Sequence, residues 1–277
     1  MKRNARGRGA LGLVERLASI STLIASLELL ARPRVYEDAH LMSWGVGQLR
    51  SRWLLSGPVG RTLAHLMAYR TFRALLVLRA IGSMGLVLGV VSGWRASVVN
   101  TTMAVSSILV MLRSPYGWDG ADQMSAITFL GLAASSWLPE IEPAVRRFFA
   151  YQLCLSYFTS GVAKATSAEW RSGAALTGIA STEMYGNEAV YSWLKHKRWL
   201  RVSAARAVIL GECAFPLVLV APSRLRQVGL VGGILFHAVA AQIMGLNTFF
   251  WSFIAVYPAL ESYCRSRKWN LSGGISW

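Results

Sequence analysis

Lys164, Trp170 and Gly173 are the residues whose types and spacing most suggest chemistry. They lie at the end of an apolar, helix-like run, in the stretch YFTSGVAKATSAEWRSG over residues 157–173. A lysine at the mouth of a membrane helix is costly unless it snorkels to the head groups or has a partner. A lysine can also act as a base near neutral pH where burial favours the neutral amine. Lys164 is therefore either a head-group anchor or the base of a buried site.

Two later apolar runs carry one ionisable side chain each, Glu212 in GECAFPLVLV and His237 in GILFHAVAAQIMG. An ionised carboxylate in mid-span is expensive, so we expect Glu212 to be protonated or paired. Its candidate partners are Arg79, Lys164 and His237. A lone histidine in an apolar helix often just bonds a neighbouring carbonyl, and no His or Cys pair at ligand spacing predicts a metal site. Glu212 and His237 are thus candidate proton partners of Lys164.

Further polar candidates lie in the first half of the chain. Arg79 sits within an apolar run and needs a carboxylate or a cluster of carbonyls, with Asp122 or Glu212 as possible partners. Asp119, Asp122 and Gln123 belong to the polar turn SPYGWDGADQM. An aspartate there could equally cap the helix that follows. We expect one aspartate to cap and the other to join a polar pocket with the lysine.

The composition predicts an all-α, polytopic membrane helix bundle. Of the 277 residues, 54% are hydrophobic and 15% are charged, with a mean hydropathy of +0.40, whereas a soluble domain carries about 25% charged residues. We expect one domain over residues 1–277, with short basic tails at both ends and seven or eight transmembrane helices. The candidate spans are 11–30, 72–94, 97–113, 121–138, 144–163, 204–222, 227–246 and 247–263.

The net charge of +16 raises the question of nucleic-acid binding, which basic surfaces favour. The basic residues instead gather beside apolar runs, at 2–8, 50–73, 195–206 and 265–268. Basic flanks of this kind attract anionic lipid head groups. We therefore expect a lipid bilayer and no nucleic acid as partner. The loop charges leave the orientation open, and residues 41–56 could form an interfacial amphipathic helix.

Small and sulfur-containing residues favour structural roles. Cys154, Cys213 and Cys264 lie in or beside apolar runs and form no C-x-x-C pair, so we interpret them as structural. Gly82, Gly85 and Gly89 lie along one side of the second predicted span, and Gly85 with Gly89 forms a G-x-x-x-G. Such glycines are typical of close helix packing. The chain has no phosphate-binding glycine loop, H-E-x-x-H or G-x-S-x-G motif, which leaves nucleotide hydrolysis, zinc proteolysis and α/β-hydrolase chemistry without support.

Several segments occur in an order that resembles the HTTM superfamily, the membrane proteins related to vitamin K-dependent gamma-carboxylase. They are SPYGWDGADQM, YQLCLSYFTSGVAKATSAEWRSGAAL, GECAFPLVL and FHAVAAQIMGLNTFF, within roughly residues 11–260. The Lys-x5-Trp-x2-Gly pattern that starts at Lys164 is the most specific element; Glu212 with Pro216 and His237 with Phe249 are weaker. The opening ERLASISTLIASLELLARP and the D-G-x-D-Q turn look most like the sporulation-delaying protein B branch.

That branch implies a factor in the bacterial cytoplasmic membrane that matures or exports a secreted antimicrobial peptide, together with processing proteins. The carboxylase comparison implies an alternative, an enzyme whose lysine, here Lys164, deprotonates a reduced quinone. Two departures weaken that alternative: Asp119 and Asp122 stand where the carboxylase has a histidine, and this sequence shows no counterpart of its large extramembrane domain. A small-molecule or proton-coupled transporter is a third hypothesis.

Overall fold

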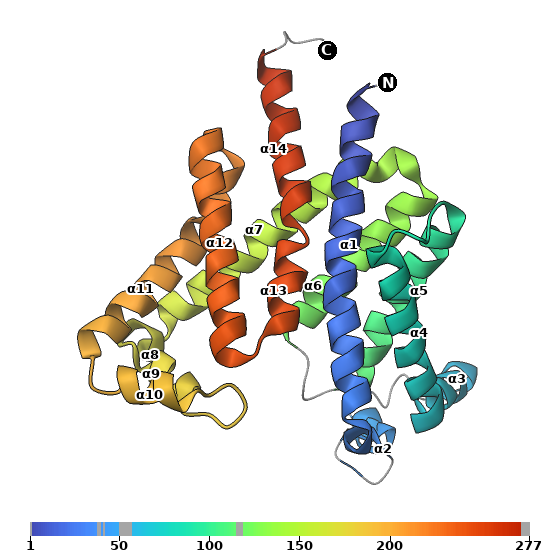
Figure 1. Cartoon of the computed structure of the whole chain (residues 1–277), viewed down its shortest axis with the longest axis horizontal. Coiled ribbons are helices and arrows are strands. Elements are labelled where there is room, and N and C mark those ends of the chain that lie inside the picture. The colour runs from blue at the N-terminus through green and yellow to red at the C-terminus, as the bar shows by residue number, and fades with distance from the viewer. Residues whose placement is uncertain (1, 38–39, 41, 50–56, 115–118, 273–277) are drawn as a thin grey trace. The chain divides into compact units, whose positions relative to one another are not determined.

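The computed structural model describes residues 2–37, 40, 42–49, 57–114 and 119–272, and every regular element among them is a helix (Figure 1). The all-α prediction is therefore confirmed for the described part of the chain. Contacts divide the chain into two compact units. Unit 1 comprises Met1–Val145 and Trp251–Pro258, and unit 2 comprises Arg146–Phe250 and Ala259–Trp277.

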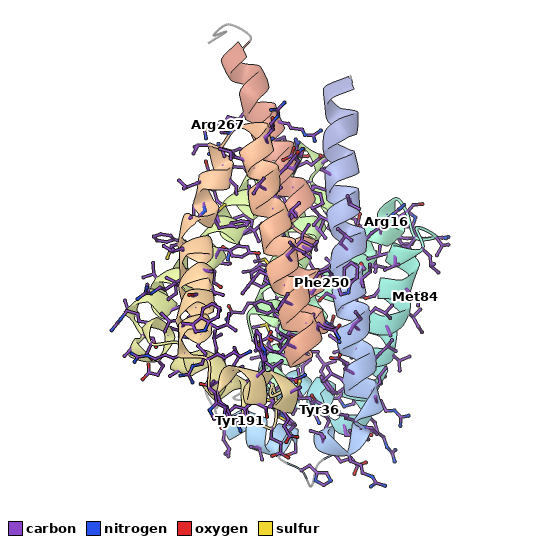
Figure 2. The ribbon with its side chains drawn as sticks, turned by 60° about the vertical axis from the view of Figure 1, so that its left-hand side comes forward. Arg16, Tyr36, Met84, Tyr191, Phe250 and Arg267 are labelled. Carbon is purple, nitrogen blue, oxygen red and sulfur yellow. The ribbon has the colours of Figure 1, made fainter. Side chains whose placement is uncertain are left out.

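Unit 1 is built on two pairs of long helices, α1 with α4 and α5 with α6 (Figure 1). Arg16 on α1 and Met84 on α4 are labelled in Figure 2, where these two helices run side by side. Apolar side chains around Phe72 and Leu76 form a core cluster in this unit. Its elements are α1 (Lys2–Ala31), η1 (Pro33–Tyr36), α2 (Trp44–Gly47), α3 (Gly57–Met67), α4 (Tyr69–Val87), α5 (Trp94–Arg113), α6 (Gly120–Trp137) and η3 (Pro139–Ile141).

Unit 2 holds most of α7, three short helices and the helices that follow them, and Tyr191 on α10 is labelled in Figure 2. Three helices are shared between the units along the chain. The first residues of α7 and α14 belong to unit 1, and α13 begins in unit 2 and ends in unit 1. The elements are α7 (Glu142–Thr166), α8 (Ala168–Arg171), α9 (Ala174–Ala180), α10 (Glu188–Leu194), α11 (Arg198–Ala214), η4 (Phe215–Leu219), α12 (Ser223–Met244), α13 (Asn247–Ile254) and α14 (Tyr257–Ser272).

Four helical segments in the described residues are long and apolar enough to cross a membrane: Gly9–Ala31, Trp94–Arg113, Arg198–Leu219 and Ser223–Met244. Each coincides with a predicted span. The remaining predicted spans are mostly helical, although residues 88–93 of the span 72–94 lie between α4 and α5. The count of seven or eight spans is not confirmed. The predicted span 247–263 is divided between α13 and α14, where Pro258 stands in the first turn of the second helix, a position that suits proline because the helix needs no donor there.

Two local predictions have definite outcomes. The Asp119 side chain accepts from the backbone N–H groups of Ala121 and Asp122, and the Asp122 side chain accepts in turn from the Asp119 N–H, a complete capping box. The predicted cap is therefore confirmed, although both aspartates take part. The predicted helix over 41–56 lies partly outside the described residues; within them, Trp44–Gly47 forms the single turn α2.

The packing prediction for Gly82, Gly85 and Gly89 is confirmed at Gly82 and Gly89 and wrong at Gly85. A Cβ on Gly85 would meet the Val91 side chain, which belongs to the chain just after the same helix. Gly89 lies beyond the end of α4 with a φ of +70°, a conformation that favours glycine. Gly82 and Gly89 both face neighbouring helices: an added Cβ would lie 2.7 Å from Met103 Cε on α5 at Gly82, and 3.1 Å from Arg16 Nη2 on α1 at Gly89.

Candidate functional site

Lys164 and Glu212 form an ion pair between α7 and α11 in unit 2. The Nζ atom of Lys164 donates to Oε1 and Oε2 of Glu212 at 3.0 Å and 2.8 Å. Ser160, one turn before the lysine on α7, accepts from the same Nζ and donates to Oε1 of Glu212 at 3.3 Å. The lysine side chain is 18% exposed and the glutamate side chain 7%. A buried carboxylate thus has an ammonium partner and a hydroxyl partner, as buried charge requires.

Glycine brings the two helix backbones together at this pair. A Cβ on Gly161 would lie 2.7 Å from the Cys213 amide nitrogen, 2.8 Å from Cys213 Sγ and 2.9 Å from Glu212 Cβ. Real Cβ atoms essentially never approach so closely, so any larger residue would separate α7 from α11. Gly161 therefore sets the distance that allows Lys164 to reach Glu212.

The segment after Lys164 runs back along α11. Gly161 lies against Cys213, whereas Gly173 lies against Arg201, with its added Cβ 2.7 Å from the Arg201 carbonyl carbon. At roughly 1.5 Å per residue, about 18 Å of α11 separates these two contacts. By the same measure Glu212 lies about 21 Å along its helix from Arg198, the first residue of a segment able to cross a membrane. The ion pair is therefore well inside that segment rather than at its end.

Trp170 and Gly173 have definite roles in this arrangement. The Nζ of Lys164 lies 5.2 Å from the centroid of the Trp170 ring, within the range of a cation–π contact. Gly173 has a φ of +76° in addition to its close approach to α11. Conformation and space both select glycine there. The spacing Lys-x5-Trp-x2-Gly thus corresponds to a lysine, the aromatic face over which its ammonium lies, and the turn that fastens the segment to α11.

A second polar contact, between Tyr157 and His237, lies on the same face of α7. Tyr157 is two turns before Lys164, and its hydroxyl lies 2.6 Å from Nε2 of His237, which is 1% exposed. The Tyr157 ring stacks on Phe215 with centroids 3.8 Å apart. The His237 ring lies 5.1 Å from that of Phe249. The histidine is therefore held among aromatic rings with a phenol as hydrogen-bond partner.

The predicted site residues fall into both units. Lys164, Trp170, Gly173, Glu212 and His237 belong to unit 2. Lys164 contacts Glu212 and Trp170, whereas Gly173 packs on α11 at Arg201 and His237 contacts Tyr157. Arg79, Asp119, Asp122 and Gln123 belong to unit 1.

In unit 1, Arg79 donates to the hydroxyl groups of Ser26, Ser106 and Ser107. Among the described residues its hydrogen-bond partners are thus hydroxyl groups and not the expected carboxylate or carbonyls. Of the two carboxylates named as candidates, Asp122 interacts with Arg79 electrostatically, without a hydrogen bond. Gln123 is exposed on α6.

Sequence reasoning missed four residues of the unit 2 cluster, namely Tyr157, Ser160, Gly161 and Phe215. Three of them share the lysine's helix at spacings of three, four and seven residues, which places them on one face. That periodicity was present in the sequence as a signal. Phe215 follows Glu212 by three residues and could have been found in the same way.

The cluster is suited to moving a proton over a short distance. An ammonium and a carboxylate in hydrogen-bond contact can exchange a proton to become a neutral amine and a carboxylic acid, without any charge leaving the site. A low-dielectric environment disfavours the charged pair relative to the neutral pair. It therefore reduces the free-energy difference between the ion pair and the neutral amine with its carboxylic acid. In the described residues, no group of three or more His, Cys, Asp or Glu side chains could hold a metal ion.

Comparison of the chain with protein-family models, with curated proteins and with solved structures found no match.

Proposed function

We propose that this protein is an integral membrane factor that matures or exports a secreted, antimicrobial-type peptide, and that the Lys164–Glu212 pair is its working part. The observation that carries this proposal is the ion pair itself, about two thirds of the way along a segment that is long and apolar enough to cross a membrane. Ionisable side chains at membrane depth are costly and commonly serve function.

Membership of the HTTM superfamily is part of the proposal. Its support is that two residues of the most specific motif, Lys164 and Trp170, are in contact at the ion pair with Glu212, and that the third, Gly173, packs against α11 at Arg201. The peptide substrate rests on the resemblance to the sporulation-delaying protein B branch. We extend the proposal to a bacterial cytoplasmic membrane, seven or eight spans, and partner proteins that process the peptide.

The surface at the start of α11, near the Gly173 contact and about 21 Å along the helix from Glu212, suits a location at the head groups. Exposed side chains on α10 and at the start of α11 combine tryptophan with basic residues, as Trp193 and Trp199 are 54% and 71% exposed and Lys197 lies 4.4 Å from the Trp193 ring centroid. Tryptophan and basic residues are enriched at membrane interfaces. A peptide that enters from this interface would reach Lys164 along the segment between Gly173 and Gly161.

A membrane enzyme with Lys164 as its base is the second candidate. The observation that favours it is the hydrogen-bonded chain from Ser160 through Lys164 to Glu212. After proton transfer within the pair, the neutral amine could take a proton from an acidic substrate group, and Glu212 would hold the proton it received. A reduced quinone is one such substrate, because its phenolic hydroxyl would supply the acidic proton. The Lys164 side chain is 18% exposed, so a substrate can reach its amine.

Mass spectrometry of the peptides released by the native host tests the proposal. Five strains are compared: deletion, wild-type complement, Lys164→Met, Glu212→Gln and Lys195→Met, all complemented strains at matched protein level. Lys195 is an exposed lysine without a carboxylate contact in the described residues, so Lys195→Met controls for the loss of a lysine. We expect the peptide to be lost or altered in the deletion, Lys164→Met and Glu212→Gln strains only.

Each other result has a definite meaning. Loss in the deletion with retention in Lys164→Met would make Lys164 a structural anchor and remove the ion pair from the mechanism. An unchanged peptide profile in the deletion strain would overturn the peptide function altogether. The gamma-carboxylase comparison implies that the base formed from the quinone removes a proton from a substrate glutamate and that carbon dioxide then adds there. A mass difference of one carbon dioxide between wild type and Lys164→Met would therefore favour the enzyme.

A further inference from the structure

Two phenols and two arginines gather on one exposed face of unit 2. The hydroxyl groups of Tyr151 on α7 and Tyr263 on α14 lie 2.9 Å apart, and their ring centroids lie 5.7 Å apart. One turn away along each helix stands an exposed arginine, Arg147 on α7 and Arg267 on α14; Arg267 is labelled in Figure 2. Both guanidinium groups act electrostatically on the Tyr263 phenol. In the described residues neither arginine forms an ion pair with a carboxylate.

Three neighbouring arginines differ from these two because they have protein partners. Arg146 donates to the Ser262 hydroxyl at 3.0 Å, which holds α7 against α14 at this level. Arg226 and Arg265 share the carboxylate of Glu261, with contacts of 2.6 Å and 2.7 Å. The exposed face therefore keeps two guanidinium forks, whose geometry suits the oxygens of a phosphate group. It also keeps a phenolic donor, because two hydroxyl groups that share one hydrogen bond have one proton left to donate.

Contacts of α14 place this face at the ends of two segments that are able to cross a membrane. Arg226, the fourth residue of one segment, donates to Glu261, two positions before Tyr263. The Sγ atom of Cys264 lies 3.9 Å from the carbonyl oxygen of Leu219, the last residue of the other segment. In a bilayer, the ends of such segments lie near the head groups. The unpaired arginines are therefore at the depth of lipid phosphates.

An exposed apolar stripe on α7 begins beside these groups. Its side chains are 40% to 55% exposed and recur every three or four residues, so they share one face of the helix. They are Phe148, Tyr151, Leu155, Phe158 and Val162.

The stripe runs from the arginines toward the interior of the membrane. Its far end lies next to Gly161, whose added Cβ would lie 2.7 Å from the nitrogen of Cys213, six residues inside the segment that ends at Leu219. From Phe148 to Val162 the stripe is about 21 Å long, at roughly 1.5 Å per residue. Half of a bilayer's hydrocarbon core is about 15 Å, so the stripe is long enough for one acyl chain.

We propose that this face binds one anionic phospholipid, with its phosphodiester group between Arg147 and Arg267 and an acyl chain along the α7 stripe. The two unpaired guanidinium groups favour an anionic lipid over a zwitterionic one, whose head group would bring a further cation beside them. The site is a surface of α7 and α14, and both parts of the lipid meet matching chemistry at the matching depth. This binding does not depend on the function proposed for the Lys164–Glu212 pair.

Native mass spectrometry of the full-length protein, released from nanodiscs of equal parts phosphatidylglycerol and phosphatidylcholine, tests this site. We expect wild type to retain one phosphatidylglycerol under conditions that remove phosphatidylcholine. Arg147→Gln and Arg267→Gln should each lower that retention about three- to tenfold, because each removes charge-assisted hydrogen bonds to the phosphate. Both arginines are exposed, so these substitutions leave the packing of α7 on α14 intact.

Matched controls separate this site from general attraction to charge. Arg224→Gln removes an exposed arginine of α12 that is not among the groups acting on Tyr263, and it should retain the lipid like wild type. Lys164→Met should do the same, which separates lipid binding from the peptide function. Glycerol phosphate, which has no acyl chain, should not displace the lipid.

Three results would overturn the proposal. The first is equal retention of the two lipids by wild type. The second is the same phosphatidylglycerol retention in Arg147→Gln, Arg267→Gln and Arg224→Gln, which would mean that the lipid responds only to overall charge. The third is displacement by glycerol phosphate, which would make the face a site for free phosphate compounds.

Discussion

Both carboxylate oxygens of Glu212 accept a hydrogen bond from one atom, the Nζ of Lys164, at 3.0 Å and 2.8 Å. The two residues are 48 positions apart and lie on different helices. The pair therefore links α7 to α11 and also fixes the position of the Lys164 ammonium. Its loss therefore has consequences for stability as well as for function, and the two can be measured separately.

Removing one partner of this pair should cost more than removing both. Glu212→Leu leaves a largely buried ammonium without its partner, and breaking a buried pair in this way costs about 3–5 kcal/mol, less where the surviving charge is partly exposed. Lys164→Met/Glu212→Leu leaves no charge and should recover much of that loss. Thermal unfolding of the purified variants in one detergent measures the difference. A double variant no more stable than Glu212→Leu would mean that the ion pair contributes little beyond packing.

Gly161→Ala should destabilise the protein although alanine favours helices. The new Cβ would lie 2.7 Å from the Cys213 nitrogen, so α7 and α11 would have to separate, at a cost of about 1–3 kcal/mol. Gly211→Ala is the matched control, because nothing lies within 4 Å of its added Cβ; it should be neutral or stabilise by roughly 0.5–1 kcal/mol. Unfolding measurements on the two variants, side by side, decide between close approach and helix propensity.

The contrast between these glycines shows what the sequence could and could not reveal. The apolar runs predicted helices, because that signal is local and periodic. The Lys-x5-Trp-x2-Gly pattern led directly to the lysine of the ion pair. Which group pairs with Glu212 was left open among Arg79, Lys164 and His237, because no local rule relates residue 164 to residue 212. Gly161 and Gly211 both lie in helices, and only the tertiary contact distinguishes them.

Arg79 was the least predictable residue for a physical reason. The expectation of a carboxylate partner followed from the cost of a buried charge. Its actual partners are serines on α1 and α5, and a serine in an apolar helix is too common to stand out. By contrast, the cap at Asp119 was predictable because a capping box needs only residues within one turn.

That cap is open to a direct test. Asp119→Ala removes the acceptor for the N–H groups at the start of α6 and should cost about 1 kcal/mol, whereas Asp119→Asn keeps an acceptor and should cost much less. Chemical or thermal unfolding of both variants measures the difference. Equal losses would show that the negative charge of Asp119, rather than its hydrogen bonds, stabilises this end of the helix.

Tyr157→Phe should weaken unit 2 without disturbing its aromatic packing. The substitution removes the 2.6 Å hydrogen bond to His237 Nε2 and keeps the ring that stacks on Phe215. A lost buried hydrogen bond that leaves its partner unsatisfied costs about 1–3 kcal/mol. Tyr151→Phe removes a phenol–phenol contact with Tyr263 near the surface and should cost less. If the two variants unfold at the same temperature, the Tyr157–His237 contact adds no stability of its own.

Gly173→Ala should be considerably more harmful than Gly245→Ala, although the two glycines have nearly the same backbone conformation. Their φ angles are +76° and +71°, so both substitutions meet the same left-handed strain, on the order of 1 kcal/mol. Only at Gly173 would the added Cβ also lie 2.7 Å from the Arg201 carbonyl carbon and 2.8 Å from the Val202 nitrogen; nothing lies within 4 Å at Gly245. The difference in unfolding free energy between the two variants measures the cost of the close approach, because the backbone strain is common to both. Equal destabilisation would show that the segment after Lys164 can move away from α11 at little cost, and the path proposed for the peptide would then lack a fixed wall.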